Sequence, residues 1–322
     1  MIPVIPVAAV LGAHADAALI EGGARSGFLT LSGVDDALGL AAARSGMLAF
    51  FAQDEAAKRT IVRHKYDPTR PNVYRGFYPC ELDKGGLVEG FDIGPDVADP
   101  ARAGDGSDPL TEPTPMPDIP GWRGATGAYY TALEALGRAV VEGLLRGLGA
   151  DPRRAGALFD RSISTLRLLH YPEHPAGTLP DDRRIEIPAG TRWIMTKPHT
   201  DSGFVTLLWQ DGTGGLQAQG PGGDWVDVPP ADGGLVVNFG QMLSDWSGGQ
   251  IRATPHRVLG GRAERFSVPF FFEPAVDAIV TPLFPENGGR SFVYGDFLWE
   301  RMVNFPNFHG VVRQPAGSRA AG

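Results

Sequence analysis

The sequence has almost no cysteine: Cys80 is the single one among 322 residues. One thiol cannot form a disulfide within the chain, which excludes the disulfide-rich secreted folds and fits a reducing compartment. Long apolar runs are also missing, and none approaches the roughly 20 residues that a helix needs to cross a bilayer. The stretch 1–17 is apolar but holds Pro3 and Pro6 and no Lys or Arg, so we expect a strand there rather than a signal peptide. These features predict a cytoplasmic protein without a membrane partner.

Basic charge is scarce as well. The chain has 29 Lys and Arg against 37 Asp and Glu, a formal net charge of −8. A nucleic-acid-binding protein would show a basic patch or stripe, so we expect no nucleic-acid partner. Hydrophobic residues make up 43% of the chain, which is ample for a buried core, and the length allows one large domain or two. No pattern in the sequence indicates an oligomeric state.

The stretch Lys197–Leu208 carries the most chemical information. His199 and Asp201 are two residues apart, so an extended strand places both side chains on one face. An imidazole and a carboxylate on one face are two of the three ligands of the facial triad that binds non-haem Fe(II). His256 is the candidate for the third ligand, with room for several strands before it. The alternatives are a strand-end pair bonded to the backbone and a structural histidine.

A second constellation follows at Arg265-Phe266-Ser267. Arg265 and Ser267 share one face of a predicted strand, while the other face carries the apolar side chains of Phe266, Val268, Phe270 and Phe272. An arginine facing a barrel interior is costly unless it is paired. A guanidinium and a hydroxyl on one face suit a carboxylate. A surface salt bridge and an ordinary strand hydroxyl are the alternatives.

From Ser164 onward, strand-like runs are punctuated by Gly, Asp and Pro, which is typical of a β-sandwich or barrel. The predicted strands cover 2–6, 27–31, 164–171, 193–197, 203–209, 215–218, 225–228, 234–239, 251–259 and 265–273. Apolar periodicity predicts helices over 8–25, 35–63, 122–149 and 291–302, and a short one after Pro152. Residues 95–121 read as a surface loop and 316–322 as a disordered tail.

In their order and spacing, His199-x-Asp201, His256 and Arg265-x-Ser267 resemble the Fe(II)- and 2-oxoglutarate-dependent oxygenases of the isopenicillin N synthase-like branch. Shorter stretches resemble the same branch, namely Ile2–Pro6, Gly27–Leu31, Tyr74–Pro79, Glu89–Gly94 and Leu166–Pro172. The resemblance covers nearly the whole chain. It implies a mainly β fold with flanking helices: a double-stranded β-helix, or jelly roll, with an N-terminal α/β segment. It also implies one oxygenase domain over 1–322, with a segment 1–163 packed on the barrel, a metal-binding core at 164–290 and a C-terminal helix and tail at 291–322.

The resemblance also implies roles. His199, Asp201 and His256 would bind Fe(II), and the distal carboxylate of 2-oxoglutarate would meet Arg265, Ser267 and Tyr171. The expected reaction uses O2 to hydroxylate, or to desaturate or cyclise, a small organic molecule, with release of succinate and CO2. The carboxylate ligand argues against halogenation, because related halogenases lack it. Leu169 departs from plant members, which often have Asn two residues before the tyrosine.

Two rival functions stay open. An oxidase of the isopenicillin N synthase type would use the same triad without 2-oxoglutarate, and would meet a substrate carboxylate with the same Arg-x-Ser pair. A β-barrel binding protein or a zinc-type hydrolase on this scaffold belongs to another class. A hydrolase wants a general base beside its metal-bound water, and no Glu next to the triad suggests one.

Seven residues fall where members of the family line the substrate pocket, with plain packing as the alternative for each: Arg75, Tyr78, Arg167, Gln241, Trp246, Phe272 and Phe297. The polar segment 173–191 is either a surface hairpin or a lid that contributes Arg183 or Arg184 to substrate binding. Cys80 is expected to be a packed thiol. Five histidines have no spacing that suits a metal and are expected at structural or surface positions: His14, His64, His170, His174 and His309.

Overall fold

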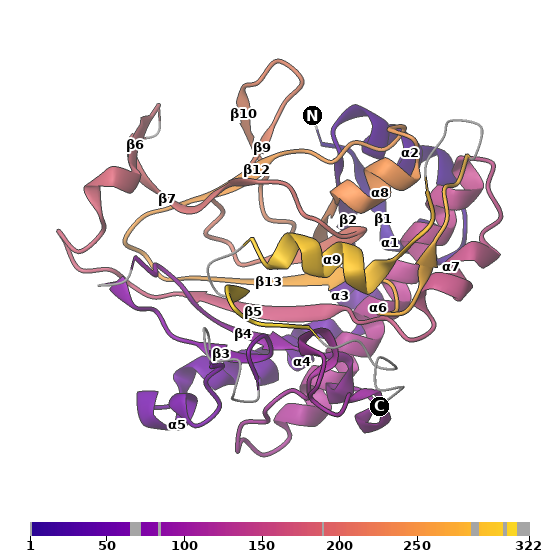
Figure 1. The fold of residues 1–322 in the computed structure, drawn as a ribbon. Helices are drawn as coiled ribbons and strands as arrows, with labels where there is room; N and C mark the ends of the chain where they lie inside the picture. Colours follow the sequence, from indigo (N-terminus) through magenta and orange to yellow (C-terminus); the bar gives the residue numbers. More distant parts are fainter. Residues whose placement is uncertain are drawn as a thin grey trace.

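Two β-sheets face each other in the computed structural model (Figure 1). The structure describes residues 2–64, 72–82, 85–188, 190–284, 290–304 and 308–313. Within these residues the larger sheet has eight strands in the order β1-β2-β11-β8-β13-β5-β4-β3, and the smaller has five in the order β10-β9-β12-β7-β6. The chain thus forms the expected jelly roll with flanking helices.

The strands of the larger sheet come from both halves of the chain. They are β1 (Val4–Pro6), β2 (Phe28–Ser32), β3 (Gly76–Tyr78), β4 (Glu89–Ile93), β5 (Thr165–Tyr171), β8 (Val205–Gln210), β11 (Leu235–Phe239) and β13 (Arg265–Phe272). The smaller sheet holds β6 (Arg184–Ile187), β7 (Gly190–His199), β9 (Leu216–Gln219), β10 (Trp225–Asp227) and β12 (His256–Gly260). A short pair, β14 (Ile279–Val280) and β15 (Phe292–Val293), precedes the last helix. The β-strand predictions after Ser164 are confirmed, although β7 is longer and β12 shorter than expected.

The helices are α1 (Val7–Leu11), α2 (Asp16–Arg25), α3 (Val34–Leu38), α4 (Leu40–Leu48), α5 (Glu55–Arg59), α6 (Trp122–Gly147), α7 (Arg153–Phe159), α8 (Gln241–Trp246) and α9 (Tyr294–Met302). The long helix at 122–149 is confirmed, and α9 confirms the closing helix. The predicted tail at 316–322 lies outside the described residues.

Two helix predictions were wrong in length. The expected helix 8–25 is split where α1 ends at Gly12, followed by Ala13 with a positive φ of 57°. The expected helix 35–63 is split at Gly39, whose φ of 66° ends α3 before α4 begins. Apolar periodicity runs across both breaks, so it cannot reveal them. The loop 95–121 is mostly irregular as expected, but Leu110 and Asp108 in it are buried, so it is not simply a surface loop.

Helix α6 covers the outer face of the larger sheet. Phe270 and Phe272 are fully buried there, and the ring of Tyr130 meets that of Phe270 edge-on at 5.0 Å. Gly137 lets the helix come close, because a Cβ at this position would lie 2.6 Å from Cγ of Phe272. The inner face of the same sheet contributes to a second, separate core that includes Phe28, Tyr171, Met195, Leu216 and Val258. The strand alternation thus sends one set of side chains to the helices and the other into the barrel.

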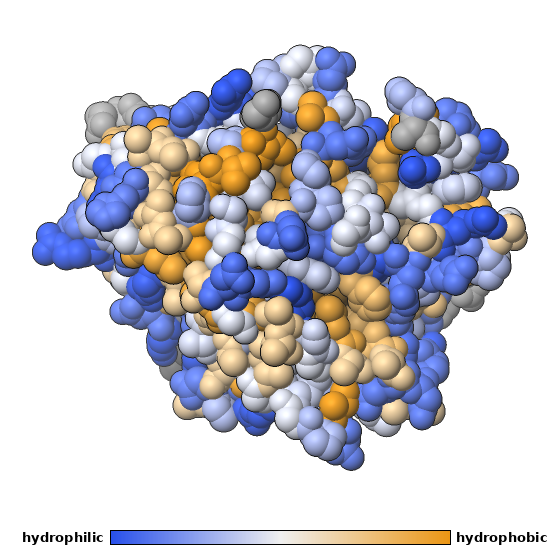
Figure 2. Space-filling view, turned by 180° about the vertical axis from the view of Figure 1, so that it is seen from behind, coloured by the Kyte–Doolittle hydropathy of each residue, from blue (hydrophilic) through white to orange (hydrophobic). Residues whose placement is uncertain are grey.

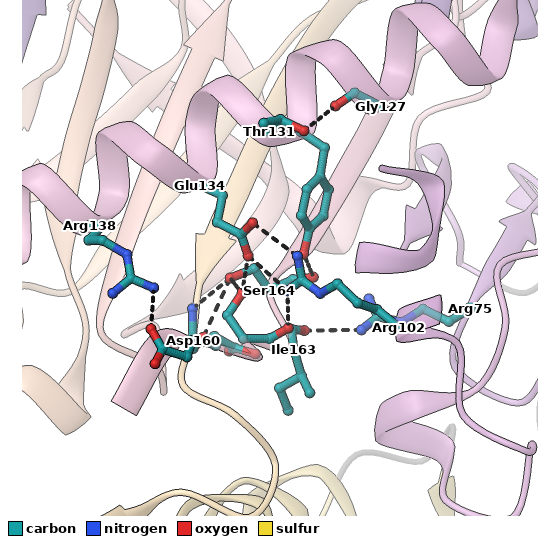
Figure 3. A network of polar contacts seen from close by, with 12 residues as sticks. Arg75, Arg102, Gly127, Thr131, Glu134, Arg138, Asp160, Ile163 and Ser164 are labelled. Atoms are coloured by element: carbon teal, nitrogen blue, oxygen red, sulfur yellow. Dashed lines mark hydrogen bonds and ion pairs between the residues drawn. The ribbon is translucent and has the colours of Figure 1, made fainter. Parts of the chain in front are cut away.

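A polar network ties α6 to the chain that leads into β5 (Figure 3). Arg102 donates to both carboxylate oxygens of Glu134 at 2.8 and 3.0 Å and to the carbonyl of Ser162. The hydroxyl of Tyr130 donates to the carbonyl of Ser164 at 2.8 Å. These bonds fix the start of β5, the strand that carries Tyr171 at its other end.

Seen from behind, the surface mixes hydrophilic residues with separate hydrophobic patches (Figure 2). Among the described helices, none combines the length and apolar character that a membrane span requires.

Candidate metal centre and carboxylate site

The three predicted metal ligands meet at one end of the barrel. His199 is the last residue of β7 and His256 the first of β12, and the two are direct partners across the ladder. Nε2 of each histidine lies 3.6 Å from Oδ1 of Asp201. The candidate ligand atoms all lie within 4.8 Å of one another. Two imidazoles and one carboxylate at this spacing fit a single metal ion of the facial-triad type.

Backbone carbonyls orient both imidazoles. Nδ1 of His199 lies 2.9 Å from the carbonyl oxygen of Lys197, and Nδ1 of His256 lies 3.2 Å from that of Thr254. A carbonyl oxygen can only accept, so each Nδ1 carries the proton and each Nε2 keeps its lone pair free. This is the arrangement that a metal-binding histidine requires.

Two further side chains orient the carboxylate. Oδ2 of Asp201 accepts hydrogen bonds from Thr206 Oγ1 at 2.5 Å and from Asn238 Nδ2 at 2.7 Å, which leaves Oδ1 to face the imidazoles. Burial opposes the charged form, but the two histidines and these hydrogen bonds outweigh it, so the pKa of Asp201 lies below its ordinary value. Thr206 and Asn238 were not predicted from the sequence. Polar residues on the inner face of the otherwise apolar strands β8 and β11 are the signal that could have found them.

The predicted carboxylate anchor is a buried arginine. Arg265 is 3% exposed, and it donates from Nε to the carbonyl of Gly214 at 2.7 Å and from Nη1 to Ser267 Oγ at 3.1 Å. Its third bond, from Nη2 to Gln210 Oε1, is 3.3 Å long. The guanidinium carbon lies 4.8 Å from the ring centroid of Tyr171, its partner on β5. No acidic side chain pairs with Arg265 among the described residues, so this buried cation lacks a counter-charge.

Strand register places the anchor and the metal ligands on the same side of the larger sheet. Ser267 is the partner of Gln210 on β8, and Phe271 is the partner of Thr206, which holds Asp201. The two pairs therefore belong to one face, four residues apart along β13. Leu169 takes the place of the Asn that plant members often have. It is the partner of Ser267 on β5, so the surface beside Ser267 is apolar.

Arg167 lies on the same face of β5 and is held by a buried acid. It donates from Nε and Nη2 to the two oxygens of Asp92 at 2.5 and 3.1 Å, and Arg63 donates to the same carboxylate at 2.6 Å. Burial opposes the charge on Asp92, but Arg167 and Arg63 outweigh it and keep its pKa below the ordinary value. The guanidinium of Arg167 lies 5.3 Å from the ring of Phe271. The cluster has two cations for one acid, so it presents net positive charge.

Three of the other substrate candidates have the contacts of packing residues. Arg75 has no exposed surface and donates to the carbonyl of Ile163 at 3.1 Å and to Thr165 Oγ1 at 2.7 Å (Figure 3). Trp246 is buried and donates from Nε1 to a backbone carbonyl at 2.9 Å. For Phe272 the expectation of a pocket position was wrong, because strand alternation turns its ring to the outer face, where it stacks on Phe159 at 4.3 Å.

Tyr78, Gln241 and Phe297 are half-buried. The guanidinium carbon of Arg63 lies 4.1 Å from the ring centroid of Tyr78. The backbone N–H of Gln241 donates to the carbonyl of Asp201 at 2.8 Å, which ties the start of α8 to the metal-binding loop. Phe297 stacks on Phe292 at 5.3 Å.

Two residues near the end of β13 were not predicted from the sequence: Phe271 on its inner face and Glu273 directly after its last residue. The alternation that places Arg265 and Ser267 inside continues to Phe271, and the chain then brings Glu273 close to the metal-binding loop. A Cβ at Gly203 would lie 2.9 Å from Oε1 of Glu273 and 3.4 Å from the hydroxyl of Tyr294. Burial raises the pKa of Glu273 to about 7.

The remaining histidines keep away from the metal site. In the part of the chain that the structure describes, no group of potential ligands other than the triad gathers three members. His170 bonds to Glu89 at 2.7 Å and to Glu264 at 2.9 Å, while His174 is buried and His14 and His309 are exposed. Cys80 is half-buried, and burial raises the pKa of its thiol to about 11, which suits a packed thiol.

The segment 173–191 does not cover the metal. Strand β6 pairs with the first residues of β7, with Arg184 opposite Trp193, whereas His199 is at the other end of β7. Arg183 donates to the carbonyl of Gly85 at 3.0 Å, and Arg184 pairs with Glu186 at 2.9 Å. These residues lie at the end of the barrel opposite the metal ligands, so a lid over the site mouth stays a prediction for this other end only.

A family model and several known proteins match this sequence. The family model described as the 2OG-Fe(II) oxygenase superfamily matches residues 162–274, which hold the triad and the arginine anchor. The 2-oxoglutarate-Fe(II) type oxidoreductase hxnY of Emericella nidulans is 33% identical over 199 residues, covering 61% of this chain and 54% of the relative. The 2-oxoglutarate-dependent dioxygenase frbA of Dothideomycetidae sp. is 30% identical over 246 residues, covering 69% and 70%.

A third relative is matched over a longer stretch. Isopenicillin N synthase of Streptomyces clavuligerus is 26% identical over 261 residues, covering 77% of this chain and 76% of the relative. The chain spans about half the length of the first two fungal oxidoreductases that it matches.

The fold is shared with solved structures. A full-length Neurospora crassa protein in complex with alpha-KG and thymine superposes with a TM-score of 0.76 at 23% identity, covering 94% of this chain and 96% of the other. The family match lies on the residues that form the triad, and similarity to frbA extends over more than two thirds of that protein. The chain belongs to the 2-oxoglutarate–Fe(II) oxygenase superfamily.

Proposed function

We propose that the protein is an Fe(II)- and 2-oxoglutarate-dependent dioxygenase that oxidises a small organic molecule with O2 and releases succinate and CO2. The main support for this proposal is the environment of Arg265. It is a buried guanidinium without an acidic partner in the described chain, and it shares one face of the sheet with the residues that hold Asp201. An uncompensated buried cation is costly, and a bound carboxylate removes that cost.

The donor set fits iron. His199, His256 and Asp201 supply two neutral nitrogens and one carboxylate oxygen, and three ligands leave other positions open on an octahedral ion. When bound, Fe(II) supplies the redox chemistry with O2 that no side chain of this chain can provide. The contribution of the protein is to hold both imidazoles in the Nδ1-protonated form and to fix the carboxylate through Thr206 and Asn238.

In the proposed arrangement Arg265, Ser267 and Tyr171 hold the distal carboxylate of 2-oxoglutarate. Arg265 offers a planar fork for a bidentate contact, and its present bonds to Gly214, Ser267 and Gln210 already fix its orientation. Tyr171 packs beneath the guanidinium at 4.8 Å. The cosubstrate would therefore bind a preformed anchor.

The organic substrate is proposed to lie on the side of Arg167 and Phe271. Arg167 is 29% exposed and held firmly by Asp92, and Phe271 offers a half-buried ring beside it. Tyr78, Gln241 and Phe297 stay candidates as further contacts, whereas Arg75, Trp246 and Phe272 serve packing. A molecule with an anionic or hydrogen-bond-accepting group suits the net positive charge of this cluster. We also propose that residues 1–322 form a single domain. A cytoplasmic location is proposed as well, because a single cysteine fits a reducing compartment.

The proposal is tested by anaerobic titration. Fe(II) and then 2-oxoglutarate are added to the purified protein, and the visible charge-transfer band of an iron-chelated keto acid is recorded. We expect a band that weakens strongly in Arg265→Ala. The control is Arg257→Ala. Arg257 is on β12 of the smaller sheet and bonds to Gln217 on β9, so its removal should leave the band unchanged.

Other outcomes identify the rivals. Iron binding without a band, together with substrate oxidation that releases no succinate, would support the oxidase of the isopenicillin N synthase type. Tightly held zinc and no oxygen consumption would support a hydrolase or a binding protein. Failure to bind any metal would overturn the triad itself.

A further inference from the structure

A cavity of about 430 Å³ opens on the side of Arg265 that faces away from the metal ligands. Its inner wall is buried and includes Tyr171, Met195, Leu259 and Arg265. Its rim is exposed at Thr213, Arg262, Ala263 and Asp227, and half-buried at Gly261. The cavity therefore extends from an exposed rim to the buried side chain of the proposed carboxylate anchor.

The cavity and the metal centre lie at opposite ends of the barrel. Arg192 is at the start of β7 and lines the cavity, while His199 ends the same strand. Seven residues of extended strand span about 23 Å. On β12, His256 is at the metal end and Leu259 at the cavity end. Figure 1 shows this second end at the left, where β6 meets β7, while α8, which is tied to the metal-binding loop, lies toward the right.

The cavity is positively charged in an acidic protein. It is lined by three arginines, Arg192, Arg262 and Arg265, and by one acid, Asp227, which gives a local charge of +2 against −8 for the chain. Asp227 accepts a hydrogen bond from Gln217 at 2.8 Å. In the described parts of the chain neither Arg192 nor Arg262 has an acidic partner. A dianion is repelled by the protein as a whole and attracted to this opening.

We propose that this cavity is a second mouth of the active site, through which the dicarboxylate cosubstrate enters and its dicarboxylate product leaves. The inference rests on the proposed function. A 2-oxoglutarate molecule that enters with its keto-acid end first brings its distal carboxylate to Arg265 last, which is the orientation that the anchor and the metal require. Succinate leaves along the same path in reverse.

The wall between mouth and anchor is made of small residues and one flexible side chain. Glycines stand on both sides of it, at Gly214 and Gly215 and at Gly260 and Gly261. Gly260 lies against Met195, since a Cβ there would be 2.5 Å from Cγ of the methionine. Methionine is flexible and changes rotamer at low cost. Nε of Arg265 donates to Gly214, so the guanidinium of the anchor is bonded to this glycine-rich rim.

A separate mouth has a kinetic consequence. The organic substrate is proposed to lie beside Phe271 and Arg167, on the metal side of the anchor. The cosubstrate then binds and dissociates without displacing the substrate. A site with one mouth would instead trap the dicarboxylate beneath a bound substrate.

The experiment measures the rate of cosubstrate binding by anaerobic stopped flow. The Fe(II)-loaded protein is mixed with 2-oxoglutarate, and the growth of the charge-transfer band gives the association and dissociation rate constants at several salt concentrations. The first variant is Arg192→Ala/Arg262→Ala. The matched control, Arg25→Ala/Arg153→Ala, removes the same charge at exposed positions elsewhere. The second variant, Gly261→Trp, narrows the mouth at a position where a Cβ meets nothing within 4 Å.

We expect the double arginine variant to bind 2-oxoglutarate about tenfold more slowly than the control, with a weaker dependence on salt. Gly261→Trp should slow association and dissociation by similar factors and leave the equilibrium affinity nearly unchanged, because a narrowed path alters the barrier and not the bound state. Unchanged rate constants in both variants would overturn the second mouth. A wild-type protein that forms no band would instead overturn the proposed function.

Discussion

Thr206 donates a hydrogen bond of 2.5 Å to Asp201, the only carboxylate of the metal triad. The bond comes from an inner-face residue of β8, so the core of the larger sheet sets the orientation of a ligand that lies on a loop. The opposite oxygen of Asp201 stays free for the metal. The two residues together show how the barrel positions the site.

Replacing this hydroxyl should weaken metal binding without unfolding the protein. Valine has nearly the shape of threonine but cannot donate, so Thr206→Val leaves Asp201 with the bond from Asn238 alone. Loss of such an outer partner costs about 10–100-fold in metal affinity. Competition with a metal chelator measures the change, and Thr206→Ser, which keeps the hydroxyl, serves as the control. Equal affinity of the valine and serine variants would contradict this orienting role.

Gly137 on α6 gives a test of the packing between helix and sheet. A methyl group at this position would lie 2.6 Å from Cγ of the buried Phe272, so Gly137→Ala should lower the free energy of unfolding by about 1–3 kcal/mol. The control is Gly124→Ala on the same helix, where a Cβ meets nothing within 4 Å. That change should stabilise the protein by about 0.5–1 kcal/mol. Denaturant unfolding of both variants measures the difference, and effects of the same sign would refute the close approach.

Local patterns predicted the chemistry of this protein better than its helix boundaries. The spacing of His199 and Asp201 and the alternation around Arg265 are properties of single strands, and single strands fix which side chains share a face. The helix breaks at Ala13 and Gly39 depend on backbone dihedrals that apolar periodicity does not express.

Other features depend on contacts between distant segments. Asp92 and Arg167 are far apart in sequence, and their ion pair exists because β4 and β5 are neighbours in the sheet. Phe272 was assigned to a pocket by resemblance, although its alternation with Arg265 already places it on the opposite face. The alternation rule alone would have selected Phe271.

Glu273 should make the stability of the protein depend on pH. Burial raises the pKa of its carboxyl to about 7 in the folded state, well above the ordinary value of about 4.5. The folded state therefore holds this proton more tightly than the unfolded state. Its contribution to stability is fully present below about pH 4.5 and is lost as the pH rises through about 7, an effect of about 3 kcal/mol.

The isosteric variant Glu273→Gln carries no such proton. We expect the variant to become more stable relative to the wild type as the pH rises from 5 to 8, because only the wild type loses the contribution of this proton. Urea unfolding at both pH values measures this difference. A constant difference across the range would show that Glu273 keeps an ordinary pKa in the folded protein.

Replacing Asp92 is predicted to destabilise the protein strongly. Asp92 is fully buried and pairs with both Arg63 and Arg167 through bonds of 2.5–3.1 Å. Asp92→Ala leaves two guanidinium groups without their counter-charge, and breaking a buried ion pair from one side costs about 3–5 kcal/mol. The matched control is Asp160→Ala, because Asp160 also pairs with an arginine, at 3.3 Å, but its side chain is 78% exposed. That change should cost under about 1 kcal/mol. Chemical denaturation gives the free energy of unfolding of both variants. Similar decreases would mean that burial does not determine how much these ion pairs contribute to stability.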